Sequence, residues 1–162
     1  MEFKGHSDIR GYDGMKDLGF GIVVSEFNEL ITSNLLGGAI KAFNECRVNR
    51  ADLAILKVPG AFEIPQAAKK LCSKEGWGID AVVCLGAVIR GETSHFDYIC
   101  AEVSRGIGQV GLEFNIPVLF GVLTTENLEQ AIARSGSGSA NKGYETALAA
   151  VRMATLYRMC GD

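Results

Sequence analysis

Short apolar runs rich in β-branched residues alternate along this chain with longer segments in which apolar residues recur every three or four positions. The runs have the length of strands and cover residues 20–25, 53–58, 81–89 and 117–123. The intervening segments have the period of amphipathic helices. Because strands that alternate with helices form parallel sheets through right-handed crossovers, the pattern predicts an α/β protein. We expect a three-layer α/β/α sandwich around a four-stranded parallel sheet.

The predicted helices each carry a regular apolar stripe. One covers residues 64–72 and has Pro65 in its first turn, where proline is well tolerated. A short helix begins at Asn127, which is spaced from Gln130 as in a capping box. The stripes of the other three helices are Ile31, Leu35, Ile40 and Phe43; Ile99, Val103, Ile107, Val110 and Phe114; and Tyr144, Leu148, Val151, Thr155 and Met159.

The chain reads as one domain preceded by a short arm. Its 162 residues are enough for a single core. Residues 1–18 are polar and interrupted by glycine, so we assign them to an N-terminal arm and residues 19–162 to the domain. The net charge of −3 and a pI near 5.4 argue against a general affinity for nucleic acid or anionic membranes. No apolar run approaches the roughly 20 residues that span a bilayer.

Cysteine usage and the N-terminal residues predict a cytoplasmic protein. The five cysteines are odd in number and include no CxxC pair, so we expect reduced thiols. The first residues lack the apolar stretch of a signal peptide. A metal site is not expected, because no second histidine or cysteine stands at ligand spacing from His95.

Polar and aromatic residues follow the predicted strands, at the edge where open parallel sheets bind ligands. Phe27 and Asn28 follow the first strand, and Phe62 and Glu63 follow the second. The two aromatic rings are suited to sandwich a flat heterocycle, while the amide and the carboxylate are suited to bind hydroxyl groups. The alternative is that each aromatic ring packs its own loop against the sheet.

His95 is a candidate acid–base group. It is one of two histidines and lies where the third strand passes into a helix. An imidazole changes charge near neutral pH and can transfer protons. The alternative is a capping or surface histidine.

Two segments are candidate anion sites. Gly91, Glu92, Thr93 and Ser94 lead into a helix whose first N–H groups and dipole favour an anion, although the charge of Glu92 opposes one. The segment matches neither a Walker loop nor a Rossmann fingerprint. Arg134 and Lys142 bracket a second, Gly/Ser-rich segment, where a planar guanidinium can grip a phosphate. The alternative there is a flexible linker with two solvated cations.

Taken in order, these segments resemble the lumazine synthase family across nearly the whole chain from residue 20 onward. Any one motif is weak, but all of them in order and at the family's spacing are specific. The motifs lie at residues 24–28 with 31–32, 58–65, 85–91, 93–98, 120–124, 129–131 with 134, and 141–143.

The resemblance implies a flavodoxin-like fold and a transferase that needs no cofactor. The family condenses 5-amino-6-(D-ribitylamino)uracil with 3,4-dihydroxy-2-butanone 4-phosphate to give 6,7-dimethyl-8-ribityllumazine, phosphate and water, the penultimate step of riboflavin biosynthesis. His95 and Arg134 are implied as catalytic residues. The residues implied to bind substrate are Phe27, Asn28, Ala61, Phe62, Glu63, Ala87, Val88, Ile89, Gly91, Glu92, Thr93, Ser94, Phe120 and Lys142.

The resemblance also implies an assembly. Family members form pentamers, and some close twelve pentamers into a hollow shell of sixty subunits. A neighbouring subunit then completes the site with Phe120, Arg134 and Lys142. The six residues between Arg134 and Asn141 are the compact length associated with shell-forming members. Riboflavin synthase is a candidate partner.

Three alternatives accompany this interpretation. The first is a flavin or lumazine binder without catalysis, and the second is a shell-forming protein with empty sites. The third is a flavodoxin-like electron carrier that holds FMN. The presence of both His95 and Arg134 argues against the first alternative, and we rank the enzyme above all three.

Overall fold

The computed structural model describes residues 17–73, 77–138 and 140–161; the predicted arm, apart from its last two residues, lies outside this range. The main elements are β1 (Gly19–Ser25), α1 (Glu29–Glu45), β2 (Leu53–Val58), α2 (Ile64–Cys72), β3 (Ile79–Ile89), α3 (His95–Phe114), β4 (Val118–Thr125), α4 (Leu128–Ser135) and α5 (Lys142–Cys160). Short 3₁₀ turns precede β2 (Arg50–Asp52) and α2 (Ala61–Glu63).

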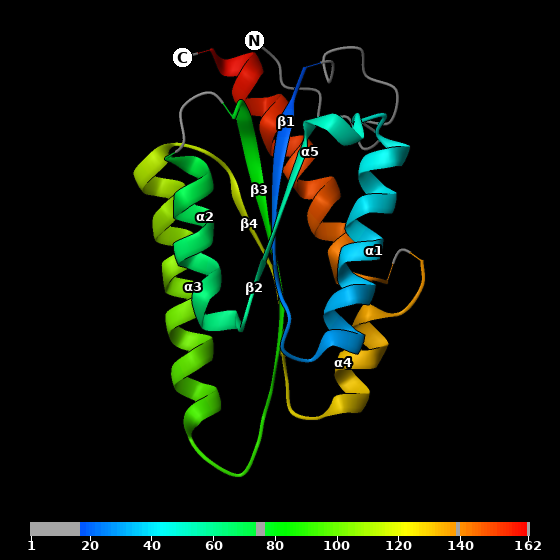
Figure 1. Cartoon of the computed structure of the whole chain (residues 1–162), viewed down its shortest axis with the longest axis vertical. Helices are drawn as coiled ribbons and strands as arrows, with labels where there is room; N and C mark the ends of the chain where they lie inside the picture. The colour runs from blue at the N-terminus through cyan, green and yellow to red at the C-terminus, as the bar shows by residue number, and fades with distance from the viewer. Residues whose placement is uncertain (1–16, 74–76, 139, 162) are drawn as a thin grey trace.

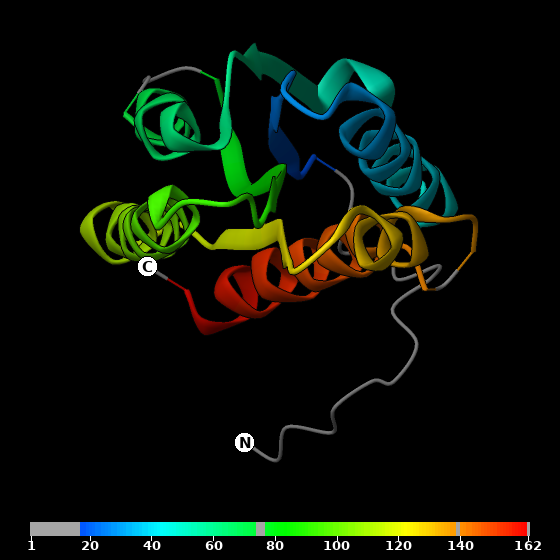
Figure 2. The same cartoon turned by 90° about the horizontal axis from the view of Figure 1, so that it is seen from below.

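The four strands form one parallel sheet in the order β2-β1-β3-β4. Helices α2 and α3 cover one face, and α1, α4 and α5 cover the other (Figures 1 and 2). The predicted three-layer α/β/α sandwich with a flavodoxin-like, four-stranded sheet is therefore confirmed.

Alternating side chains of the strands fill two cores. Phe20, Ile22 and Val24 of β1 point to the core under α1 and α5, where the Phe20 and Phe43 rings lie 4.8 Å apart. Val23 points to the other core, under α2 and α3. Both faces of the central strands are covered, which explains why β3 is apolar almost throughout.

The structure corrects one predicted strand end and the predicted burial of three residues. Strand β4 continues to Thr125 instead of ending at residue 123. Ile40 is only half-buried, because Ala39 occupies the inward position of α1, and Met159 is exposed near the end of α5. Leu18, which we assigned to the arm, is buried in the core.

The close approach of α1 and α5 explains the small residues between them. The buried face of α5 consists of residues no larger than valine: Gly143, Thr146, Ala147, Ala150, Val151, Ala154 and Thr155. A Cβ atom added to Gly143 would lie 2.0 Å from the backbone oxygen of Leu35. Of the predicted stripe, Val151 and Thr155 are buried and Tyr144 and Leu148 pack against the core, whereas small residues that we did not predict fill the rest of this face.

None of the helices in the described ranges combines the length and the apolar character that crossing a membrane requires.

We predict that Gly143→Ala lowers the free energy of unfolding by about 1–3 kcal/mol, because the added methyl group forces the α1 and α5 backbones apart. The matched control is Gly37→Ala, also on a helix, where nothing lies within 4 Å of the new Cβ. Its expected effect is a gain of about 0.5–1 kcal/mol. Urea denaturation at one fixed protein concentration measures both changes, and equal values would contradict the close approach.

Candidate active site

The four strand-to-helix connections lie at one end of the sheet and are joined by hydrogen bonds (Figure 1). Beyond β1, the Glu26 and Phe27 amides donate to the carbonyls of Val58 and Pro59 at 2.8 and 3.1 Å. Beyond β3, the Arg90 amide donates to the Thr125 carbonyl at 2.9 Å. We call this end, formed by residues 26–28, 59–63, 87–95 and 125–127, the carboxyl rim.

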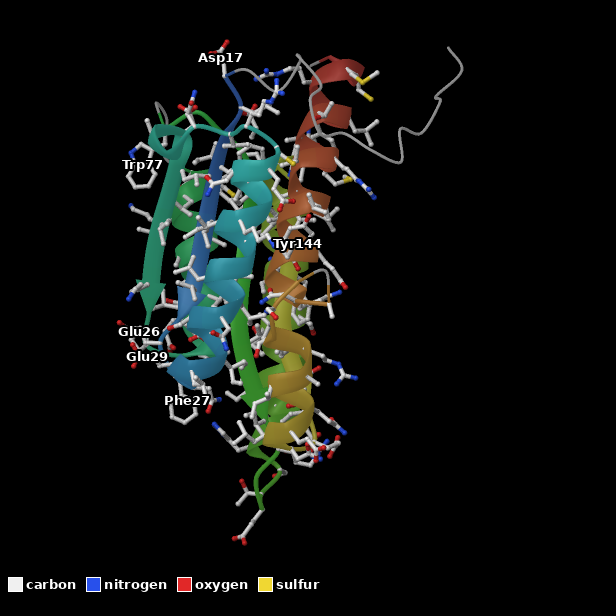
Figure 3. The ribbon with its side chains drawn as sticks, turned by 90° about the vertical axis from the view of Figure 1, so that its right-hand side faces the viewer. Asp17, Glu26, Phe27, Glu29, Trp77 and Tyr144 are labelled. Atoms are coloured by element: carbon white, nitrogen blue, oxygen red, sulfur yellow. The ribbon has the colours of Figure 1, made fainter. Side chains whose placement is uncertain are left out.

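The β1–α1 connection presents Phe27 and fixes Asn28. Phe27 is 71% exposed and projects from the end of the sheet (Figure 3). Asn28 adopts a left-handed backbone conformation with φ of 61°, and its Nδ2 donates to the Ala87 carbonyl at 2.9 Å. Since the amide nitrogen is engaged by β3, the Asn28 Oδ1 atom is the part of this side chain suited to receive a ligand hydroxyl.

The β2–α2 connection is the short 3₁₀ turn Ala61–Glu63. Ala61 is buried, whereas Phe62 is about half exposed. The Glu63 Oε2 atom accepts a hydrogen bond of 3.0 Å from the Gly60 amide, so this carboxylate helps to hold the turn. Phe27 and Phe62 thus stand on neighbouring connections with much of each ring accessible.

The β3–α3 connection carries the candidate anion loop and His95. Ala87 is buried and Val88 and Ile89 are half-buried at the strand end. Gly91, Glu92, Thr93, Ser94 and His95 are all exposed. The Ser94 side chain does not cap α3, and the Thr93 hydroxyl accepts only a long 3.4 Å hydrogen bond from the His95 amide. The start of this 20-residue helix is therefore open to an incoming anion.

Three predicted residues lie away from the rim in a single chain. Phe120 pairs with Cys84 in the middle of β3 and is partly exposed on the edge strand β4. Arg134 lies in the last turn of α4, and Lys142 begins α5. These two helices cover the opposite face of the sheet from α3 (Figure 2). One chain thus does not bring Arg134 and Lys142 to His95.

Asn141 is a residue whose importance the sequence analysis missed. It is buried, and its Oδ1 accepts from the Tyr144 amide at the start of α5. Its Nδ2 donates to the carbonyls of Asn34, Ser135 and Gly136 at 2.9 to 3.0 Å. The start of α5 is therefore anchored to α1 and to the end of α4 at Asn141. An asparagine directly before a helical stripe was the available signal.

Residues 17–158 match the family model described as 6,7-dimethyl-8-ribityllumazine synthase. The chain belongs to this family. Membership indicates a transferase-type enzyme, and it agrees with the order of motifs along the rim. The match begins at Asp17, so it covers every residue that we singled out for a site.

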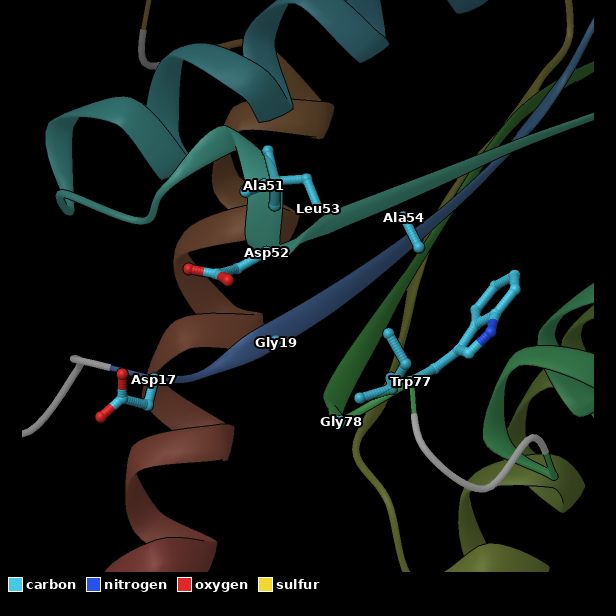
Figure 4. A pocket seen from close by; sticks show the side chains of 9 residues that line it. Asp17, Gly19, Ala51, Asp52, Leu53, Ala54, Trp77 and Gly78 are labelled. Carbon is cyan, nitrogen blue, oxygen red and sulfur yellow. The ribbon is translucent and has the colours of Figure 1, made fainter.

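A hollow of about 460 Å³ opens at the end of the sheet opposite the carboxyl rim (Figure 4). Asp17, Asp52 and Trp77 line it, and Figure 3 places Trp77 and Asp17 far from Phe27. It contains none of the residues that the sequence predicted for the site. Among the described residues, no group of three or more His, Cys, Asp or Glu side chains is placed to hold a metal ion.

Burial makes Cys84 and the half-buried Cys72 and Cys100 poor nucleophiles. Burial raises the pKa of the Cys72 thiol to about 11 and raises the pKa of Cys84 further. Burial likewise raises the pKa of Cys100. Since the thiolate is the reactive form, these three side chains stay protonated at neutral pH and do not supply a covalent mechanism.

Two replacements of Asn28 distinguish its hydrogen bond to Ala87 from its left-handed backbone conformation. Asn28→Ala removes the bond to Ala87 and places a Cβ without local hydrogen bonding in the left-handed region, so we expect a loss of about 2 kcal/mol. Asn28→Gly removes the same bond but tolerates the positive φ, and its loss should be about 1 kcal/mol smaller. Urea denaturation measures both, and a glycine variant no more stable than the alanine variant would contradict the assigned strain.

Proposed function

We propose that this chain is a lumazine synthase that condenses 5-amino-6-(D-ribitylamino)uracil with 3,4-dihydroxy-2-butanone 4-phosphate to 6,7-dimethyl-8-ribityllumazine, the penultimate step of riboflavin biosynthesis. The observation that carries the proposal is the carboxyl rim. It brings exposed aromatic rings, hydroxyl-binding groups, an uncapped helix start and His95 to one end of the sheet. The family match supports the same reaction class.

The pyrimidine is proposed to lie against the accessible Phe27 ring, with backbone contacts from Ala87, Val88 and Ile89. A flat heteroaromatic ring stacks well on such a side chain. The ribityl chain then extends toward Asn28 and the turn Ala61–Glu63, where the Asn28 Oδ1 and the Phe62 ring are available. Because the Asn28 Nδ2 already donates to Ala87, the Asn28 Oδ1 is the atom of this amide that contacts a ribityl hydroxyl.

The phosphate of the second substrate is proposed to bind at Gly91, Glu92, Thr93 and Ser94. The exposed loop and the uncapped start of α3 supply N–H donors and a favourable dipole. Glu92 is exposed, which allows its charge to point away from the anion.

His95 is the proposed acid–base group. The pyrimidine brings its own amine, so imine formation does not require a catalytic lysine. Phosphate elimination and ring closure need proton transfers, which an exposed imidazole beside the phosphate loop can perform. Holding the two substrates in register contributes the remaining acceleration.

A neighbouring subunit is proposed to complete each site with Phe120, Arg134 and Lys142. The Arg134 guanidinium donates to the Gln130 carbonyl and meets no carboxylate in the described part of the chain, so its charge is available for a phosphate. Lys142 already pairs with Glu145 at 3.1 Å, so we assign it the weaker role.

The assembly is proposed to be a pentamer, and in its closed form a shell of sixty subunits. Large apolar side chains are exposed on the single chain, including Leu112 at 88%, Tyr98, Leu128 and Ile132. Exposed apolar surface of this kind is typical of a subunit interface. We place the protein in the cytoplasm, with riboflavin synthase as the enzyme that receives its product.

Mixing the purified protein with both substrates tests the proposed reaction. We expect lumazine absorbance to appear at a rate proportional to protein concentration and above a control without protein. The control matters because the condensation has an unaided background. A rate equal to background from a folded oligomer would contradict the proposal and favour a ligand-binding or shell-forming protein.

A further inference from the structure

Arg90 connects three parts of the carboxyl rim. Its Nη2 and Nη1 atoms donate to the two carboxylate oxygens of Asp97 at 2.9 and 3.2 Å. Its Nε donates to Glu126 Oε2 at 2.7 Å. Its Cζ lies 4.1 Å from the centre of the Phe96 ring. The guanidinium therefore holds the end of β3, the first turn of α3 and the β4–α4 connection together. We call these four residues the Arg90 clasp.

The clasp residues flank the candidate phosphate loop, residues 91–94, on both sides. Arg90 directly precedes Gly91, and Asp97 lies in the first turn of α3, two residues after His95. Within the loop itself, as the structure describes it, the side-chain bonding amounts to the long contact between Thr93 and the His95 amide. Backbone hydrogen bonds from the Arg90 amide to Thr125 and from the Asp97 amide to Ser94 bracket the loop, and the clasp adds the side-chain interactions that fix its two ends.

Geometry and charge make this clasp more than an ordinary surface ion pair. A bidentate guanidinium–carboxylate pair fixes direction as well as distance, and the Phe96 ring supports the guanidinium from one side. The pair also neutralises Asp97, whose carboxylate would otherwise face an anion at the same helix end. A lysine in place of Arg90 would keep the charge but lose the fork that holds two carboxylates.

The clasp is intact at neutral pH. The hydrogen bond from Arg90 lowers the pKa of Asp97 below its usual value of 3.8, and the hydrogen bond to Asp97 raises the pKa of Arg90. A carboxyl group with a lowered pKa in the folded state contributes above its ordinary pKa and loses that contribution only as the pH falls through the lowered value. Both partners are therefore charged at neutral pH.

We propose that Arg90 is a positioning residue that fixes the loop formed by residues 91–94 and the start of α3 for phosphate binding and proton transfer. This inference rests on the proposed function. Arg90 does not touch the substrates in this account; it acts through Asp97 and Glu126.

Arg90→Lys and Asp97→Asn test the clasp, with Arg105→Lys as the matched control. Arg105 also forms a two-pronged pair with a carboxylate, that of Glu102, but within the middle of α3 and away from the loop. We expect each clasp variant to lower kcat/KM for the phosphate substrate by about 10- to 100-fold, because small misplacements of reacting groups carry large rate penalties. The KM for the pyrimidine and the melting temperature should stay close to those of the control.

The double variant Arg90→Lys/Asp97→Asn distinguishes a shared role from two separate ones. If both residues act through the clasp, the double variant loses no more activity than the more impaired single variant. Additive losses, or a parallel rise in both KM values with a lowered melting temperature, would show general structural damage and overturn the proposal.

Binding of inorganic phosphate to the same variants separates this inference from the proposed reaction. Weaker phosphate binding by both clasp variants than by Arg105→Lys supports the clasp even if the wild-type protein forms no lumazine, an outcome that would overturn the reaction alone. Wild-type turnover with clasp variants that match the control in phosphate Kd, KM and kcat would overturn the clasp alone.

Discussion

The parallel pairing of β3 with β1 and β4 is the constraint on which the rest of this structure depends. Leu85 pairs with both Val24 and Gly121, so the three strands run in the same direction and their carboxyl ends meet at one edge. The two faces of the sheet then need separate helical layers. The turn Ala61–Glu63 reaches the same edge through the parallel pairing of β2 with β1. Hydrogen bonds from Phe27, Asn28 and Arg90 to neighbouring strands and connections hold this edge together.

The sequence predicted the layers and the rim because both follow from local pattern. The strand at Leu53–Val58 and the helix at Ile64–Cys72 have the boundaries expected from apolar run length and from Pro65. The cap at Asn127 is confirmed by its bond with the Gln130 amide, although the Gln130 side chain reaches Glu126 instead of the capping residue. These features depend on residues close in the chain.

Contacts between distant residues were harder to predict. Asn141 joins α5 to α1 across more than 100 residues, and a composition rich in glycine and serine concealed this. Met159 matched a helical period but is exposed, because it lies in the last turn of α5, beyond the last buried residue of that helix, Thr155. Arg90 and Glu126 are 36 residues apart in the chain, and only the fold brings them together. The hydrophobic period and the composition of a segment do not predict contacts between residues far apart in the chain.

The residues of the proposed active site are divided between two chains. Residues 91–94, His95 and Phe27 lie on the carboxyl rim. Arg134 lies in the last turn of α4, which covers the face of the sheet opposite to α3 (Figure 2). The proposed site requires the proposed oligomer, in which the α4 side of one subunit would lie beside the rim of the next. The apolar side chains exposed on the single chain support this proposal.

Subunit complementation tests this central claim most directly. Homo-oligomers of His95→Ala and of Arg134→Ala are each predicted to lose activity. After dissociation and joint reassembly in equal amounts, a shared site would contain both native residues in about one quarter of cases, so activity should return to about that fraction of the wild-type value. Reassembled mixtures that stay as inactive as either parent would contradict a site shared between subunits and would require Arg134 and His95 to act within one chain.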